Sequence, residues 1–234
     1  MIRWALIDAA SVPGGGGELR LMQRGAEFSI FSGGGELMNS RRVGSEQALA
    51  ALACEALQGR PAPHLLIGGF GMGFTLRAAL DGLCPRARVT VAELVPAVIA
   101  WARGPMAHLN GAGLDDPRTS LVIGDVGALI DAARAEYDAI LLDVDNGPEG
   151  LSRPANDRLY DERGLGAARR ALKPGGVLAV WSSAINPAFS QRLRRAGFAV
   201  REAKVRSGGG RKGAHHIVWL ATAPGAIAPG PRRA

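Results

Sequence analysis

The chain of 234 residues contains only two cysteines, Cys54 and Cys84, which is too few for a disulfide framework. Two lone thiols are typical of a reducing compartment, so we expect a cytoplasmic protein. No run in the sequence approaches the ~18 uncharged apolar residues that a membrane helix requires, so no membrane association is expected. The apolar opening of the chain is too short for a secretory leader and is interrupted by Asp8.

Lysine and aromatic residues are also scarce. Only three of the 28 basic residues are lysines, and aromatic residues make up 5% of the chain. The net charge of +7 raises the question of nucleic-acid binding, but no aromatic residues that could stack on bases accompany the arginine clusters. We therefore do not expect nucleic acid as a partner. No Cys/His spacing fits a metal site, so no metal is expected either.

The pattern of apolar residues divides the chain into parts. Residues 1–40 contain short, partly alternating runs between glycine clusters, which predicts a small β-hairpin region. Residues 41–222 form the main predicted domain, beginning with a helix over 45–57 that has Ser45 as its N-cap. The last residues, 223–234, have no periodicity and are expected to be disordered.

Within the main domain, apolar strands alternate with helical stretches from residue 64 onward. The predicted helices cover residues 74–83, 95–109, 126–135, 159–172 and 187–196. This alternation predicts an α/β fold with a Rossmann-like, seven-stranded, mainly parallel sheet. The last two strands are joined by RSGGGRKGA, which is too short for a helical crossover, so an antiparallel C-terminal hairpin is expected.

The first strand of that sheet runs into a glycine-rich loop. The text LLIGGFGMGF, residues 65–74, places Gly69, Gly71, Met72 and Gly73 between a strand and a helix. Glycine permits positive φ and close backbone approach, and the following helix offers free N–H groups to a ligand. A plain tight turn is the alternative interpretation of this loop.

Acidic residues follow the next two strands. Glu93, with Leu94 beside it, ends the second strand and is placed to accept both ribose hydroxyls of an adenosine. Asp125 ends the third strand, where it could accept from an adenine amino group while Val126 covers the ring. Structural alternatives remain, because Glu93 could stabilise a helix N-terminus and Asp125 could be an N-cap. Three such features at successive strand ends nevertheless favour an adenosine-derived ligand.

The loop spacing separates two kinds of adenosine ligand. A dinucleotide fingerprint G-x-G-x-x-G that starts at Gly69 would need glycine at position 74, which is Phe74. The spacing G-x-G-x-G with a terminal hairpin instead resembles the class I S-adenosylmethionine-dependent transferases. Over residues 36–183 the chain is similar to their spermidine synthase-like family, in the segments MNSRRVGSEQALA, LLIGGFGMGFTLRAAL, VAELVPAVIAWAR, DDPRTSLVIGDVGALI and YDAILLDVDNGPEGL. That family also carries a small N-terminal β-hairpin domain.

The chain departs from the aminopropyltransferases of that family in three places. The aspartate of their glycine loop is replaced by Met72, their D-S-S-D-P by DVDNGP from Asp143 on, and their Tyr-His pair by the text Val43-Gly-Ser-Glu46. Decarboxylated S-adenosylmethionine presents a bare ammonium, which needs a carboxylate in a site sheltered from water. Met72 therefore favours intact S-adenosylmethionine as donor, and methyl transfer to an amine or hydroxyl of a small molecule.

Three alternatives stay open. Asp143 alone could hold an aminopropyl ammonium, which would allow a polyamine aminopropyltransferase that uses decarboxylated S-adenosylmethionine. A nucleic-acid methyltransferase is the second alternative, although the text DVDNGP lacks the [DN]-P-P-[YF] pattern of amino-group methylation. The third is a nucleoside-binding module without turnover. The family resemblance also implies that homo-oligomers are possible.

Asp143 and Asp145 are the predicted catalytic residues. Asp143 should face the reactive end of the donor, and Asp145 should act as the general base, unless DNGP is simply an Asx turn. The segment around Asn156 and Tyr160 is expected to wall the acceptor site, with Tyr160 in the core. Trp181 and Ser182 end the fifth strand and are expected at the functional edge, with the Trp181 side chain buried by packing. His64, His215 and His216 are expected to lie far from the loop edge.

Overall fold

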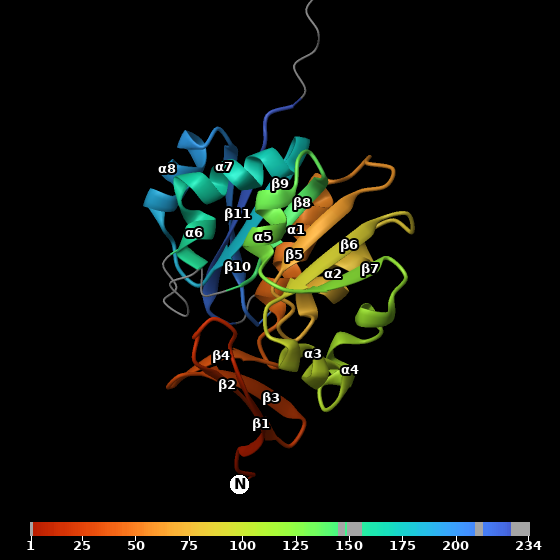
Figure 1. Ribbon diagram of the computed structural model, residues 1–234, viewed down its shortest axis with the longest axis vertical. Helices are drawn as coiled ribbons and strands as arrows, with labels where there is room; N and C mark the ends of the chain where they lie inside the picture. Colours follow the sequence, from red (N-terminus) through yellow and green to blue (C-terminus); the bar gives the residue numbers. More distant parts are fainter. Residues whose placement is uncertain (1, 145–147, 149–155, 209–212, 226–234) are drawn as a thin grey trace, which may run out of the picture.

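The computed structural model describes residues 2–144, 148, 156–208 and 213–225. Figure 1 shows two sheets, a small one at the N-terminal end of the molecule and a large one flanked by helices. Asp145 and most of the predicted tail lie outside the described residues. In the described part of the chain, no helix is long and apolar enough to cross a membrane.

The N-terminal residues form a four-stranded antiparallel sheet in the order β1-β2-β3-β4. Its strands are β1 (Ala5–Ser11), β2 (Glu18–Arg24), β3 (Glu27–Ser32) and β4 (Gly35–Asn39). Leu19, Leu21, Phe28 and Ile30 alternate along β2 and β3 and are buried in the same core cluster as the first helices of the main domain. The sheet is also tied to that domain by a hydrogen bond of 2.7 Å from Trp101 Nε1 to Asp8 Oδ2.

The main domain contains the seven-stranded sheet that the sequence predicts. Its order is β10-β11-β9-β8-β5-β6-β7. The parallel strands are β5 (His64–Gly68), β6 (Arg88–Glu93), β7 (Thr119–Ile123), β8 (Tyr137–Leu142) and β9 (Leu172–Ser182). The antiparallel hairpin consists of β10 (Ala199–Arg206) and β11 (His215–Thr222). The predicted fold class is therefore confirmed.

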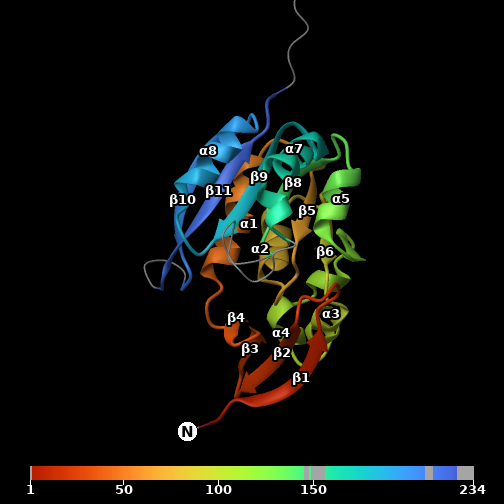
Figure 2. The same cartoon turned by 60° about the vertical axis from the view of Figure 1, so that its left-hand side comes forward.

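Helices cover both faces of this sheet, as the two views in Figures 1 and 2 show. One face carries α1 (Gly44–Ala56), α2 (Phe74–Gly82), α3 (Pro96–Arg103) and α4 (Ala107–Asn110), the last followed by a short 3₁₀ turn at Gly113–Asp115. The other face carries α5 (Val126–Ala132), α6 (Asp157–Tyr160), α7 (Glu162–Ala171) and α8 (Pro187–Arg195). Each helical layer packs on its own cluster of apolar side chains.

Three details of the predicted helices are wrong. The helix predicted over 159–172 divides at Asp161 into α6 and α7. The helix predicted over 95–109 divides into α3 and α4 because Gly104 ends α3 and Pro105 follows it. Ser45 is not an N-cap, because α1 begins one residue earlier, at Gly44, after Val43. The Ser45 hydroxyl instead donates to Glu46 Oε2 at 2.8 Å.

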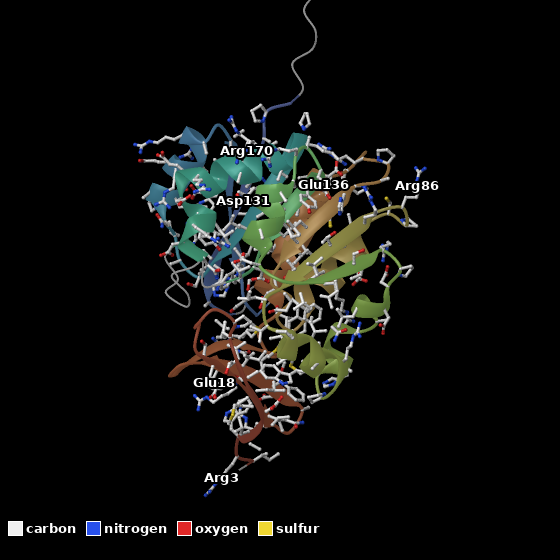
Figure 3. All side chains as sticks on the ribbon, viewed as in Figure 1. Arg3, Glu18, Arg86, Asp131, Glu136 and Arg170 are labelled. Carbon is white, nitrogen blue, oxygen red and sulfur yellow. The ribbon has the colours of Figure 1, made fainter. Side chains whose placement is uncertain are left out.

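A buried carboxylate holds the edge of the sheet at which β5 and β8 begin. Asp138 on β8 is 3% exposed and accepts from Arg60 Nη1 at 2.5 Å, from Lys173 Nζ at 2.6 Å and from the His64 N–H at 2.7 Å. Burial raises the pKa of Asp138, but these donors outweigh burial and hold the pKa below its ordinary value. Figure 3 shows Glu136 and Arg170 near this edge, at the end of the molecule away from Arg3 and Glu18 on the small sheet.

We expect Asp138→Asn to destabilise the fold by about 2–3 kcal/mol, because two cations then lose a buried partner. The matched control is Glu27→Gln, which removes the partner of Arg24 in a pair whose side chains are 35% and 36% exposed. That change should cost less than about 1 kcal/mol. Denaturant unfolding at pH 7 measures both, and equal losses in the two variants would contradict the assignment.

Candidate active site

The order of the strands fixes where a ligand can bind. From β5 the chain moves outward to β6 and β7, then returns to place β8 on the other side of β5. The loops that leave β5 and β8 therefore diverge, and ligands of open α/β sheets bind at this switch point, beyond the carboxyl ends of the strands. The glycine loop follows β5 and Asp143 follows β8.

A cavity that opens to solvent lies at this edge of the sheet. Its floor consists of strand ends and the loops that follow them, at Gly69, Gly71, Ala92, Glu93, Leu94, Val95, Val98, Gly124, Asp125, Val126, Asp143, Val144 and Asn156. Its roof comes from the small sheet, at Val12, Gly16, Leu19, Ile30, Ser32, Leu37 and Met38. We call this space the nucleoside cavity. It brings together most of the residues that the sequence predicts for the donor.

The glycine loop is fitted closely to its surroundings. Gly69, Gly71 and Gly73 all have positive φ, at 84°, 56° and 85°. A Cβ atom at Gly69 would lie 2.4 Å from the Asp143 carbonyl oxygen, and one at Gly71 would lie 3.1 Å from Met38 Sδ. The loop therefore requires glycine at these positions both for backbone conformation and for close approach.

Glu93 connects the glycine loop to the next strand. Its carboxylate is 7% exposed and accepts the Phe70 N–H at 2.9 Å and the Val95 N–H at 2.8 Å. Burial raises the pKa of Glu93, and these backbone N–H groups oppose the rise. The carboxylate still borders the nucleoside cavity, and its contact with ligand hydroxyls stays a prediction.

Asp125 is an N-cap, as the structural alternative proposes. Its Oδ1 accepts the Gly127 N–H at 2.8 Å, and Arg158 Nη2 donates to its Oδ2 at 2.5 Å. Asp125 and Val126 nevertheless line the nucleoside cavity. Capping therefore does not remove the carboxylate from the ligand space, and its contact with an adenine stays a prediction. The pairing with Arg158 has no signal in the sequence pattern.

A second cavity adjoins the first. It is lined by Leu37, Met38, Asn39, Glu46, Phe70, Gly71, Met72, Phe74, Thr75, Asp143, Val144 and Trp181. Asp143 and Gly71 border both cavities, so the two spaces meet at the end of β8. We call this second space the acceptor cavity. Apolar and aromatic side chains form most of its wall, and Glu46 and Asp143 are its two acids among the described residues.

The two acids influence each other. Burial raises the pKa of Glu46 to about 7, the negative charge of Asp143 contributes to the rise, and the hydrogen bond from Ser45 opposes it. Burial also raises the pKa of Asp143, while the Thr75 hydroxyl, which donates to Asp143 Oδ2 at 2.7 Å, opposes that rise. Two nearby carboxylates in an apolar cavity favour either a shared proton or a bound cation.

The remaining predicted donor residues are divided between the two spaces. Met72 is 3% exposed and lines the acceptor cavity, whereas Gly73 lines neither cavity and packs on Asn110 and Phe70. Asp145 lies outside the described residues, so its role as a base stays a prediction. No three His, Cys, Asp or Glu side chains gather to hold a metal ion in the part of the chain that the structure describes.

Expectations for the outer wall were partly wrong. Tyr160 is 2% exposed and packs against Phe189, as expected, but Asn156 borders the nucleoside cavity. Trp181 lies at the functional edge, as expected, but its side chain lines the acceptor cavity and is only partly buried. His216 is not remote from this edge, since its ring centroid lies 4.9 Å from that of Trp181.

The error about the histidines has a simple cause. β11 runs antiparallel to β9, and Ile217 pairs with Ser182 at the end of β9. Because β11 is antiparallel to β9, it begins at the edge of the sheet where β9 ends, so His215 and His216 lie at the functional edge. His64, in contrast, begins a parallel strand at the opposite edge, as expected.

Glu46 is the residue that sequence reasoning missed. It lies in the first turn of α1, before the first strand of the large sheet. The sequence signal at Glu46 is an acid at the start of a helix. Such an acid is equally well explained by its favourable interaction with the helix dipole. Only the packing of α1 beside β8 and β9 shows that this acid faces Asp143.

Comparison with known protein families shows to which family the chain belongs. The model of the spermine/spermidine synthase domain matches residues 46–192, which is more than half of the chain. The chain belongs to the spermine/spermidine synthase family. The resemblance stated from the sequence motifs is thereby confirmed, and the match begins at Glu46.

Relatives within this family carry two kinds of name. A polyamine aminopropyltransferase of Korarchaeum cryptofilum is 32% identical over 58% of this chain and 40% of its own length. A putrescine N-methyltransferase of Nicotiana tabacum is 37% identical over 53% of this chain and 33% of its own length. The matches thus span less than half the length of these relatives.

Solved structures of the family share the fold. The spermidine synthase from Thermotoga maritima superposes with a TM-score of 0.70 at 20% identity, covering 92% of this chain and 72% of that one. A spermidine synthase in complex with the transition-state analogue AdoDATO gives the same values. The small sheet and the large sheet are therefore both parts of an arrangement found in the family.

We expect Gly73→Ala to destabilise the protein by about 2–5 kcal/mol. Positive φ alone costs roughly 1–2 kcal/mol, and a Cβ atom here would lie 2.5 Å from Asn110 Cβ. The matched control is Gly15→Ala, since Gly15 has φ of 79° but nothing within 4 Å of such a Cβ. Thermal melts of both variants separate backbone strain from the clash, and an equal effect would contradict the tight fit.

The raised pKa of Glu46 has a consequence for stability. The folded protein binds this proton more tightly than the unfolded chain, so the free energy of unfolding should fall as pH rises from about 4.5 to 7, by about 2–3 kcal/mol. Glu46→Gln removes this component, so the variant should be more stable than wild type above pH 7. Denaturant unfolding across this pH range measures the effect, and a less stable variant at pH 8 would contradict it.

Proposed function

We propose that the protein is an S-adenosylmethionine-dependent transferase that methylates an amine of a small molecule. The observation that carries this proposal is the pair Glu46 and Asp143, two carboxylates that face one mainly apolar cavity. Such a pair suits a cationic amine better than a neutral hydroxyl. We therefore propose an amine as the acceptor, whereas the sequence motifs alone allow an amine or a hydroxyl.

The nucleoside cavity fits an adenosyl donor by its shape and its polar groups. The backbone of Gly69 and Gly71 borders this cavity in a conformation that close packing on Asp143 and Met38 fixes, and the carboxylate of Glu93 would accept from hydroxyl groups of the donor. Apolar contact with a base would come from Leu94, Val95 and Val126. When bound, the donor would supply a carbon activated by a neighbouring sulfonium.

Met72 bears on which donor is used. It is buried on the wall of the acceptor cavity at the loop position where the family's aminopropyltransferases carry an aspartate. A thioether cannot balance the charge of a bare ammonium. Intact S-adenosylmethionine carries its own carboxylate beside its ammonium, so the protein does not need to supply a carboxylate at this position to balance the charge.

The main contribution of the residues to catalysis would be alignment. Asp143 borders both cavities and would hold the amine near the reactive carbon, while the apolar wall excludes water. Fixing the two partners in line can supply roughly 7–11 kcal/mol of the barrier reduction. Thr75 keeps the Asp143 carboxylate in one orientation through its hydrogen bond.

Aminopropyl transfer is the second candidate. Relatives with both names match this chain at similar identity. Glu46 and Asp143 together could also balance the ammonium of decarboxylated S-adenosylmethionine, which would compensate for Met72. This alternative differs from the first in its donor, and the donor can be tested directly.

The test is to add each donor separately to a thermal melt and to a reaction with a panel of amines and phenols. A ligand at a hundredfold excess over its dissociation constant adds about 2.7 kcal/mol of stability. We expect stabilisation by S-adenosylmethionine and formation of S-adenosylhomocysteine with an amine. Formation of methylthioadenosine alone, from the decarboxylated donor, would overturn methyl transfer in favour of the second candidate.

A further inference from the structure

We propose that Glu46 is the proton acceptor that converts the bound ammonium of the acceptor into a nucleophilic amine, while Asp143 remains its anchor. This inference rests on the proposed function of the same site. It assigns the two acids different roles because they occupy different places. Asp143 borders both cavities, whereas Glu46 borders the acceptor cavity alone.

The elements that carry the two carboxylates also differ. The hydroxyl of Thr75, in the first turn of α2, donates to Asp143 at 2.7 Å, and the hydroxyl of Ser45, in the first turn of α1, donates to Glu46 at 2.8 Å. Each carboxylate thus accepts one hydrogen bond from a buried hydroxyl, so the division of roles rests on their different places and not on these bonds.

The charges around Glu46 keep it close to its proton-transfer range. Among the described residues that wall the cavity, Asp143 from β8 is the only other ionisable group, and Asn39, Thr75 and Trp181 are neutral. Behind Trp181 lies His216, whose pKa is lowered by burial and by the charge of Arg42, so it is neutral near pH 7. A base whose pKa lies near the working pH is the most effective proton acceptor.

The proton balance of the step is as follows. An acceptor enters as R–NH₃⁺ and loses one proton to the Glu46 carboxylate, which becomes a neutral carboxylic acid. The freed lone pair on nitrogen forms the new N–C bond, and the electron pair of the breaking C–S bond stays on sulfur. The product is a methylated ammonium, and Glu46 then releases its proton to solvent.

Asp145 is the rival for this role. The sequence motif predicts it as the base, and it lies outside the described residues. Comparison of Glu46→Gln with Asp145→Asn therefore distinguishes the two candidate bases in one experiment. Glu55→Gln is the matched control, because Glu55 is exposed near the other end of the same helix α1.

The first measurement is the dependence of kcat/KM on pH for five proteins, which are wild type, the three variants above and Glu46→Asp. On the acid side, kcat/KM of the wild type should fall about tenfold per pH unit as Glu46 becomes protonated. Glu46→Gln should lower kcat by about 10²–10⁴-fold and abolish this acid limb, and Glu46→Asp should restore part of both. An acid limb that persists in Glu46→Gln but disappears in Asp145→Asn would overturn the proposal.

The second measurement needs no turnover. Calorimetry of amine binding to the protein with S-adenosylhomocysteine, at pH 6.5 in two buffers of different ionisation enthalpy, counts the protons released. A bound ammonium should drive Glu46 to its ionised form, releasing about half to one proton in wild type and in Glu55→Gln. Glu46→Gln should release close to none, and equal release in all proteins would overturn the inference.

The two measurements also separate this inference from the proposed function. Amine binding with proton release but without S-adenosylhomocysteine as product would overturn methyl transfer and leave the proton site supported. Turnover with unchanged pH dependence in Glu46→Gln would overturn only the role of Glu46. Failure of every amine in the panel to bind would overturn both.

Discussion

The site depends on one buried carboxylate that accepts hydrogen bonds from backbone rather than from side chains. Glu93 receives N–H groups from the glycine loop and from the segment that starts α3. A loop with three left-handed glycines has little conformational preference of its own, so it needs an external partner to adopt one shape. Glu93 supplies that partner while its carboxylate also borders the ligand space.

This arrangement explains why the same few residues serve both structure and recognition. Asp125 caps α5, pairs with Arg158 and borders the nucleoside cavity, and Thr75 lies in the first turn of α2 and orients Asp143. The capping and binding interpretations of such acids were treated as alternatives at the level of sequence. A carboxylate has several lone pairs, however, so one oxygen can satisfy a helix while still facing a ligand.

The sequence predicted the large sheet and the donor side of the site because these follow from local patterns. Glu93 ends its strand, Asp125 and Asp143 closely follow theirs, and the carboxyl ends of parallel strands meet at one edge. Glu46 could not be found in this way, since its position depends on how α1 packs across β8 and β9. The error at His216 arose from strand direction, because the hairpin was predicted correctly but its starting edge was not.

The roof of the nucleoside cavity has a further meaning. Floor and roof come from different sheets, and the roof is attached through the bond from Trp101 to Asp8 and the contact of Met38 with the glycine loop. A chimera that exchanges only the first 40 residues with a relative would thus transplant half of a binding site. Leu37 and Met38 of β4 line both cavities, so such an exchange would change the walls of both while the strand ends of the large sheet stay the same.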